Sequence, residues 1–229
     1  TFKQVKADLE QGLFVLFTGT GCQIAGLKLF LGKEYLNLLA VDVICHGVPS
    51  PELWKRYVRY LEQKYGGKLY NVNFSCKEYK YLDYTIKKTN KGKKIYISKE
   101  INSFLQMFLR DYCLRPSCYE CVAKQNKVSD ITIADFWGIE EVAPEMSDGN
   151  GTSLILVRTK LGEDIITDIK ENIVCKEVSY EDGVKSNSSE YKSVDRPRER
   201  DSFFMDMCAL NFQELKEKYV HIPLEIKIK

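Results

Sequence analysis

The sequence predicts a mixed α/β protein, in which a β-α-β-α core of parallel strands is followed by an antiparallel β insertion and a cysteine-rich loop. Three observations lead to this fold class. Two apolar runs near the start each end in a turn-forming segment and are followed by a stretch with helical spacing of apolar residues. Residues 69–98 alternate apolar and polar side chains, as antiparallel strands do. Residues 113–121 contain three cysteines.

The first half of the core is expected within residues 1–31. The opening residues have the pattern of an amphipathic helix, and residues 12–17 form an apolar run that is typical of a buried strand. This run leads into Thr18-Gly19-Thr20-Gly21, and residues 22–31 then place apolar side chains at helical spacing. We therefore predict a strand, a glycine-rich turn and a helix.

The second half repeats this order. The apolar run 38–44 breaks at residues 45–51, and a helix is predicted from there to about Tyr65, with Ser50 as N-cap and Pro51 as the first helical residue. A β-α-β crossover makes the two strands parallel neighbours, and ligands bind at the carboxyl ends of such strands. The turns at residues 18–22 and 45–49 are therefore expected at one edge of the sheet.

The remaining elements follow from local periodicity and from Gly and Pro punctuation. We predict antiparallel strands over 69–98 with a turn at Asn90-Lys91-Gly92, helices over 103–112, 164–171 and 201–219, and strands over 130–134, 153–158 and 174–178. The basic runs 91–94 and 196–200 are expected to be a solvated turn and a solvated loop.

Composition excludes several classes of protein. The 229 residues are 44% hydrophobic and 29% charged, as in an ordinary globular protein, and we expect one domain over residues 1–229. With 34 basic and 32 acidic residues there is no overall footprint for nucleic acid, and no apolar run is long enough to span a membrane. No signal peptide is visible, so we expect a cytoplasmic protein. Because the chain begins at Thr1 in a helical pattern, we expect a piece of a longer polypeptide with a preceding N-terminal region.

The strongest chemical signal is the C-x4-C-x2-C run formed by Cys113, Cys118 and Cys121. Iron–sulfur clusters use such a local run together with a distant cysteine. Cys22 and Cys45 are the distant candidates, because each follows a predicted parallel strand. A structural zinc site would use the same loop, with His46 as a possible addition, and disulfides would require a secretory context that is not visible. The remaining cysteines are expected to be small buried apolar residues: Cys76, Cys175 and Cys208.

Two further segments are candidates for binding a cofactor. The run Thr18-Gly19-Thr20-Gly21 would expose backbone N–H groups at a helix N-terminus, where the helix dipole favours a phosphate, or would otherwise be a tight turn. Asp135-Phe136-Trp137-Gly138 follows a predicted strand, and its aromatic rings would line a pocket for a flat ring or belong to the core.

Taken together, four segments resemble the successive motifs of the C-terminal domain of the coenzyme F420 hydrogenase/dehydrogenase beta subunit family. Their order and spacing match over roughly Leu13 to Thr159. The four segments are Phe17–Gln23, Asp42–Ser50, Arg115–Cys121 and Ser129–Gly138.

The resemblance implies an iron–sulfur flavoprotein oxidoreductase. FAD would exchange a hydride with a deazaflavin-like small molecule, and a [4Fe–4S] cluster would pass single electrons to a ferredoxin-like domain or protein. No protein side chain is expected to act as a catalyst. The implied cofactor-binding residues are Thr18, Gly19, Thr20, Gly21, Gln23, His46, Asp135 and Trp137. The implied cluster ligands are Cys22, Cys45, Cys118 and Cys121, and whether Cys113 replaces one of them stays open.

Two other functions compete with this interpretation. In a zinc-stabilised interaction or scaffold module the thiols would only hold the loop, and such a protein would be colourless where a cluster-bearing flavoprotein is brown-yellow. A glycan-modifying transferase would need a sugar-nucleotide acid or a metal motif, and the sequence shows neither.

Overall fold

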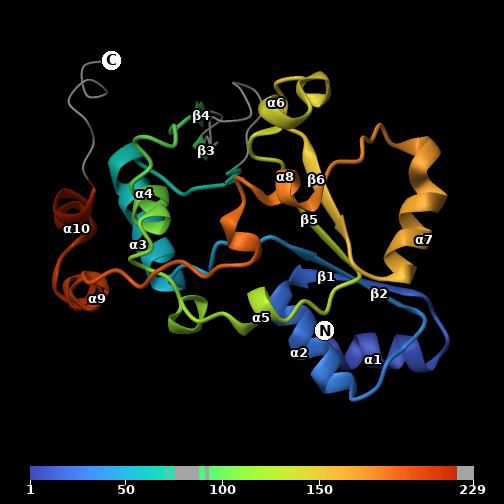
Figure 1. The fold of residues 1–229 in the computed structure, drawn as a ribbon. Coiled ribbons are helices and arrows are strands. Elements are labelled where there is room, and N and C mark those ends of the chain that lie inside the picture. Colours follow the sequence, from blue (N-terminus) through green and yellow to red (C-terminus); the bar gives the residue numbers. More distant parts are fainter. Residues whose placement is uncertain (71, 75–87, 91–92, 221–229) are drawn as a thin grey trace. The chain divides into compact units, whose positions relative to one another are not determined.

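A computed structural model describes residues 1–70, 72–74, 88–90 and 93–220 of the protein (Figure 1). Its contacts divide the chain into two compact units. Unit 1 combines Thr1–His46 with Glu120–Ser193, and unit 2 combines Gly47–Tyr119 with Val194–Lys229. The prediction of one domain over 1–229 stays a prediction. Among the described residues, no helix has both the length and the apolar character needed to cross a membrane.

Unit 1 is built on a four-stranded mixed sheet with the strand order β1-β2-β5-β6. Its strands are β1 (Val15–Thr20), β2 (Leu38–Val43), β5 (Ile131–Asp135) and β6 (Ser153–Val157). The first three run parallel and β6 is antiparallel to β5. The mixed α/β class and the parallel β-α-β start are therefore confirmed.

Helices cover one face of this sheet (Figure 1). In α1 (Phe2–Glu10) and α2 (Gly21–Leu31), the apolar residues Val5, Leu9, Leu27 and Leu31 pack with Leu38 of β2. At the other end of the same face, α6 (Ile139–Val142) and α8 (Tyr180–Val184) contribute Ile139 and Val184 to a second cluster with Leu154 of β6. Burial of these apolar side chains is what attaches the helices to the sheet.

On the opposite face of the sheet, several apolar side chains are exposed in the described part of the chain. The pairing of the strands places Leu16, Val43, Ile133, Ile155 and Val157 on this face. Each of these side chains is exposed, from 38% for Ile155 to 58% for Leu16. Parallel sheets in α/β proteins are usually covered on both faces, so this surface is unusual.

The remaining part of unit 1 departs from prediction at one strand. The predicted helix 164–171 is α7 (Lys160–Ile169) followed by a 3-10 turn, and it begins earlier because Thr159 accepts a hydrogen bond from Gly162 N–H at 3.2 Å. Residues 174–178, which were predicted as a strand, form irregular chain. None of the described strands pairs with them. Cys175 in this segment is exposed, so the prediction that it is buried is wrong.

Unit 2 is a helical assembly around an aromatic core. Tyr57 of α3, Phe104 of α4, Phe203 of α9 and Phe212 of α10 are all buried in one cluster. The helices are α3 (Pro51–Tyr65), α4 (Ser103–Leu109), α9 (Arg200–Ala209) and α10 (Phe212–Tyr219). As predicted, α3 starts at Pro51 after the N-cap Ser50, whose hydroxyl accepts a hydrogen bond from Leu53 N–H at 3.4 Å.

Two predictions for unit 2 need correction. The helix expected over 201–219 is two helices, α9 and α10, because Leu210 is extended and Asn211 caps a new helix. Cys208 is exposed, since the buried face of α9 is formed by Phe203 and Met207, and the prediction that it is buried is wrong.

The predicted β insertion is represented by the antiparallel pair β3 (Lys88–Asn90) and β4 (Lys93–Ile95). Residues 69, 70 and 72–74 are not in a strand. Predictions that concern Cys76, Tyr84, Ile86, Lys91 and Gly92 fall outside the described residues.

Two helical glycines in unit 1 provide a matched test of how closely α7 packs against the chain at the start of β5. A Cβ on Gly162 of α7 would lie 2.5 Å from the carbonyl oxygen of Asp130, whereas a Cβ on Gly26 of α2 would meet Phe2 at an ordinary 3.7 Å. Gly162→Ala should therefore lower the free energy of unfolding by about 1–3 kcal/mol through overpacking. Gly26→Ala should raise it by up to about 1 kcal/mol through better helix propensity. Urea denaturation of both variants measures the difference, and equal effects would contradict the close α7 contact.

Candidate functional site

The first turn of α2 carries one cluster of predicted site residues. Gln23 folds back over the end of β1, where its Oε1 accepts hydrogen bonds from Thr20 N–H at 2.9 Å and from the Thr20 hydroxyl at 3.2 Å. The Thr20 hydroxyl also lies 3.2 Å from Cys22 Sγ. The predicted turn is shorter than expected, because β1 continues to Thr20 and α2 begins at Gly21.

A buried carboxylate lies beside this turn. Asp42 in β2 is only 2% exposed and accepts hydrogen bonds from the hydroxyls of Ser129 at 2.9 Å and Thr132 at 2.5 Å. A Cβ on Gly21 would lie 3.0 Å from Asp42 Oδ2, so the carboxylate faces the start of α2. Sequence reasoning did not select Asp42, although an acid inside the apolar run 38–44 is a visible signal of a buried polar contact.

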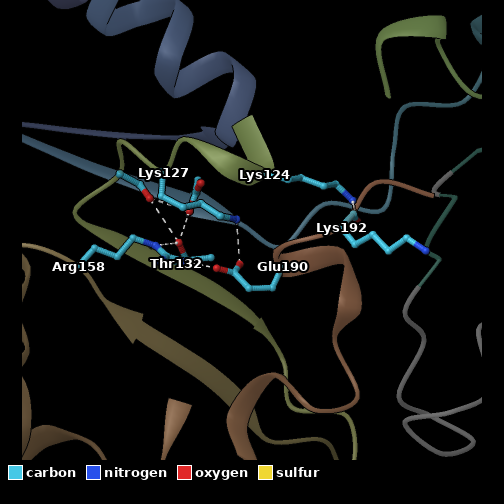
Figure 2. Close-up of polar contacts among 8 residues, drawn as sticks. Lys124, Lys127, Thr132, Arg158, Glu190 and Lys192 are labelled. Atoms are coloured by element: carbon cyan, nitrogen blue, oxygen red, sulfur yellow. Dashed lines mark hydrogen bonds and ion pairs between the residues drawn. The ribbon is translucent and has the colours of Figure 1, made fainter. Parts of the chain in front are cut away.

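Figure 2 shows that this contact continues into a charged network. Thr132 accepts a hydrogen bond from Arg158 Nε at 2.7 Å, and Arg158 Nη2 pairs with Glu190 Oε1 at 2.5 Å. Lys127 Nζ lies 2.9 Å from the other oxygen of Glu190, whose side chain is only 1% exposed. The network thus joins β2, β5, the end of β6 and the 3-10 turn at Ser188–Glu190. None of these charged residues was selected from the sequence.

Cys121 begins the short helix α5 (Val122–Gln125), which packs against α2. Its N–H donates to the Ser193 hydroxyl at 3.0 Å, and Lys124 Nζ donates to the carbonyl of Lys192 at 3.0 Å (Figure 2). A Cβ on Gly21 would lie 3.5 Å from Ala123 Cβ. Cys22 and Cys121 therefore lie at the starts of two helices of unit 1, α2 and α5, that are in contact.

An open apolar groove of about 320 Å³ lies between these helices, with Leu29 and Val122 among its lining residues.

The cysteine loop of unit 2 pairs with the segment that precedes α3. Ser50 N–H donates to the Cys113 carbonyl at 2.8 Å, and Arg115 N–H donates to the Val48 carbonyl at 2.9 Å. Val48 N–H in turn donates to Cys118 Sγ at 3.4 Å. The approach is close, because a Cβ on Gly47 would lie 2.8 Å from the Leu114 side chain. Two segments about seventy residues apart are thus held in an antiparallel arrangement.

The five candidate cysteines differ in their exposure. Cys113 is fully buried beside the aromatic core of unit 2, and burial raises the pKa of its thiol to about 11. Cys22 is exposed, and the three others are partly buried: Cys45, Cys118 and Cys121. Among the residues that the structure describes, no three His, Cys, Asp or Glu side chains are gathered closely enough to hold a metal ion.

The carboxyl ends of the three parallel strands collect the remaining predicted residues. The sheet register pairs Thr20 with Val43 and Val43 with Ile133, so the segments that follow these positions emerge at one edge. Cys45 and His46 follow β2, and both are partly buried. At the end of β5, Asp135 is exposed and Trp137 is partly buried. Phe136 between them packs into the core of unit 1.

The charged network of Figure 2 can be tested through stability. Glu190→Gln leaves Arg158 and Lys127 without their shared counter-charge in a mostly buried position. The free energy of unfolding should fall by about 3–5 kcal/mol, the usual cost of breaking a buried ion pair. Glu141→Gln is the control, since the Glu141–Lys185 pair is exposed and should leave the unfolding midpoint nearly unchanged. Equal midpoints for the two variants in urea denaturation would contradict a structural role for Glu190.

Most of the chain matches a known protein family. The family model for the C terminus of the coenzyme F420 hydrogenase/dehydrogenase beta subunit matches residues 14–183, which is well over half of the chain. The matched span contains the sheet, all five candidate cysteines and the residues at the strand ends. A search of curated proteins finds no match. On the extent of this family match, the chain belongs to the coenzyme F420 hydrogenase/dehydrogenase beta subunit family, of which it carries the C-terminal part.

Proposed function

We propose that this chain binds FAD and a [4Fe–4S] cluster and passes electrons between a deazaflavin-like two-electron partner and a ferredoxin-like one-electron partner. Its family is one of redox subunits. The observation that supports the proposal is the sheet edge of unit 1, where the parallel strands β1, β2 and β5 end next to one another and are followed in the chain by Cys22, Cys45 and Phe136. Such an edge is the usual ligand site of parallel sheets.

Short links of chain support a common site for three of the thiols. Cys118 Sγ accepts a hydrogen bond from Val48 N–H at 3.4 Å. Cys45 precedes Val48 by three residues, and Cys121 follows Cys118 by three residues. Three residues of fully extended chain reach only about 10 Å. These links set an upper limit on how far Cys45 and Cys121 can lie from Cys118 along the chain, and cluster binding would have to draw the thiols together, since they are not gathered around one point in the described residues.

The fourth thiol is linked through α2. Cys22 follows Gly21, at which an added Cβ would lie 3.5 Å from Ala123, and Ala123 is two residues beyond Cys121. Cys22, Cys45, Cys118 and Cys121 are therefore the proposed cluster ligands. Cys113 is not among them in this proposal, because its sulfur is fully buried in the core of unit 2.

The donor set fits a cluster in two further respects. All four sulfurs belong to exposed or partly buried residues, and thiolates are the ligands that iron–sulfur clusters use. The Val48 N–H that points at Cys118 Sγ would stabilise negative charge on that sulfur, as hydrogen bonds to ligand sulfurs do. The Thr20 hydroxyl would do the same for Cys22.

The proposed flavin site is the start of α2 together with the strand ends beside it. The positive end of the dipole of α2 would attract the FAD pyrophosphate, and Gly19 permits close approach of the backbone. Asp135, Trp137 and His46 would line the edge on which the ring system rests. FAD supplies the hydride chemistry, while these residues bind and orient it.

Cysteine variants test the cluster assignment. In full-length protein purified without oxygen, Cys22→Ser, Cys45→Ser, Cys118→Ser and Cys121→Ser should each lose most of the bound iron and sulfide, because a cubane needs four thiolates. Cys113→Ala should keep both, and Cys208→Ser, at an exposed position of α9, is the matched control. Iron and acid-labile sulfide are measured per chain. A colourless wild-type protein with stoichiometric zinc would favour the scaffold function instead.

A variant of Gly19, near the end of β1, tests the flavin assignment. A Cβ on Gly19 would lie 3.0 Å from Gln23 Oε1, the end of a flexible side chain. Gly19→Val should weaken FAD binding tenfold or more, which is about 1.4 kcal/mol, while the iron content stays unchanged. Gly26→Ala is the control, since Gly26 lies further along α2, where a Cβ meets Phe2 at an ordinary 3.7 Å, and this variant should keep the wild-type FAD affinity. Fluorescence titration that finds full FAD affinity in folded Gly19→Val would place the flavin elsewhere.

A further inference from the structure

The strand β1 forms one edge of the sheet of unit 1, since β2 is its only neighbour among the described strands. Val15 N–H donates to the Asn37 carbonyl at 2.8 Å, on the side of β2. Successive residues of a strand turn their backbone groups to opposite sides, so the N–H and C=O groups of Leu16 and Thr18 point outward. No described residue bonds to these groups on the outer side. The backbone of β1 is therefore open to another strand.

This edge lacks the protection that natural sheets give to an exposed strand. Charged side chains, proline, bulges or a covering segment usually prevent pairing with other chains. Residues 13–20 contain no charged residue and no proline. The edge is closed only at its carboxyl end, where Thr20 N–H donates to Gln23 Oε1 at 2.9 Å. The open part thus ends at Thr18.

Apolar side chains are exposed along the same edge. Leu13, Phe14 and Leu16 are each more than half exposed, and Leu36 is 95% exposed. Leu36 belongs to this group because it precedes Asn37, whose Nδ2 donates to the Leu13 carbonyl at 2.6 Å. A concentration of exposed apolar side chains next to open backbone groups is typical of a protein interaction site.

We propose that β1 is a homodimer interface, at which the β1 strands of two copies of this chain pair antiparallel about a two-fold axis at Leu16. The pairing would join two four-stranded sheets into one continuous sheet. A two-fold axis makes the same surface serve both copies, and such dimers are the commonest oligomers. This inference does not depend on the proposed cofactors.

Three properties of the edge favour a second copy as the occupant. The open groups extend from Phe14 to Thr18 and are centred on Leu16, so those of one copy match those of the other in spacing. Because residues 13–20 are uncharged, self-pairing brings no like charges together, and the balance of 34 basic against 32 acidic residues leaves little repulsion between whole copies. A strand pair alone is marginally stable, and the apolar side chains of both copies would add the burial that it needs.

Charge exchange at Leu16 tests this pairing in the full-length protein. The axis places Leu16 opposite Leu16 of the second copy, so Leu16→Lys and Leu16→Glu each set like charges against one another. Each variant alone should raise the dissociation constant of the dimer at least tenfold, and an equimolar mixture of the two should recover the dimer. Ile155→Lys is the control, because it adds a charge to the same face of the sheet at the other edge strand, β6, and should leave the dimer intact.

Analytical ultracentrifugation measures the dissociation constants, and circular dichroism checks folding. A monomeric wild-type protein at tens of micromolar overturns the proposal, as does equal dissociation in Ile155→Lys. A mixture of folded Leu16 variants that stays monomeric overturns the axis at Leu16.

Hydrogen exchange of the wild-type protein decides the question without a variant. The N–H groups of Leu16 and Thr18 should exchange several-fold faster on dilution below the dissociation constant, because they lose their partners in the second copy. Exchange that is independent of concentration overturns the proposal. Slow exchange in a monomer would show that another segment of the same polypeptide covers the edge.

Discussion

The elements of unit 1 that carry the predicted site depend on the buried carboxylate of Asp42. It accepts hydrogen bonds from the hydroxyls of Ser129 and Thr132, which ties β2 to β5, and it faces the first turn of α2. Through Thr132 it is coupled to Arg158, whose charge Glu190 balances. Because a buried carboxylate without hydrogen bonds is strongly unfavourable, these elements cannot shift independently. Cys22, Cys45 and Cys121 all lie within three residues of atoms held by this arrangement or by its contacts with α5.

Local signals in the sequence were sufficient for the main elements. Ser50 and Pro51 mark the start of α3, and apolar runs of strand length predict β1, β2, β5 and β6. These signals are reliable because capping and burial act within a few residues. Residues 174–178 were predicted as a strand, but they pair with none of the described strands, and there the prediction failed. A strand is stabilised by pairing with a neighbouring strand, and the sequence of a short segment does not show whether such a strand lies beside it.

The charged residues around the site could not be predicted in this way. Thr132 and Asp42 are ninety residues apart in the chain, and Arg200 and Leu114 are separated by 86 residues. Such contacts depend on the complete fold, so a buried Arg200 has the same local sequence pattern as an exposed Arg196. Burial also distinguishes Cys113 from the other thiols of the run, although spacing alone treats Cys113, Cys118 and Cys121 alike.

The exposed apolar side chains on one face of the sheet, as the described residues show them, have a consequence for how the protein is produced. Leu16, Val43, Ile133, Ile155 and Val157 form strand surface of the kind that adheres to other chains during synthesis. At high expression, the yield of native protein is then governed by the competition between folding and self-association, which depends on concentration. Slow expression at low temperature, or an increased supply of chaperones, is therefore the appropriate way to obtain material, because both favour folding over self-association.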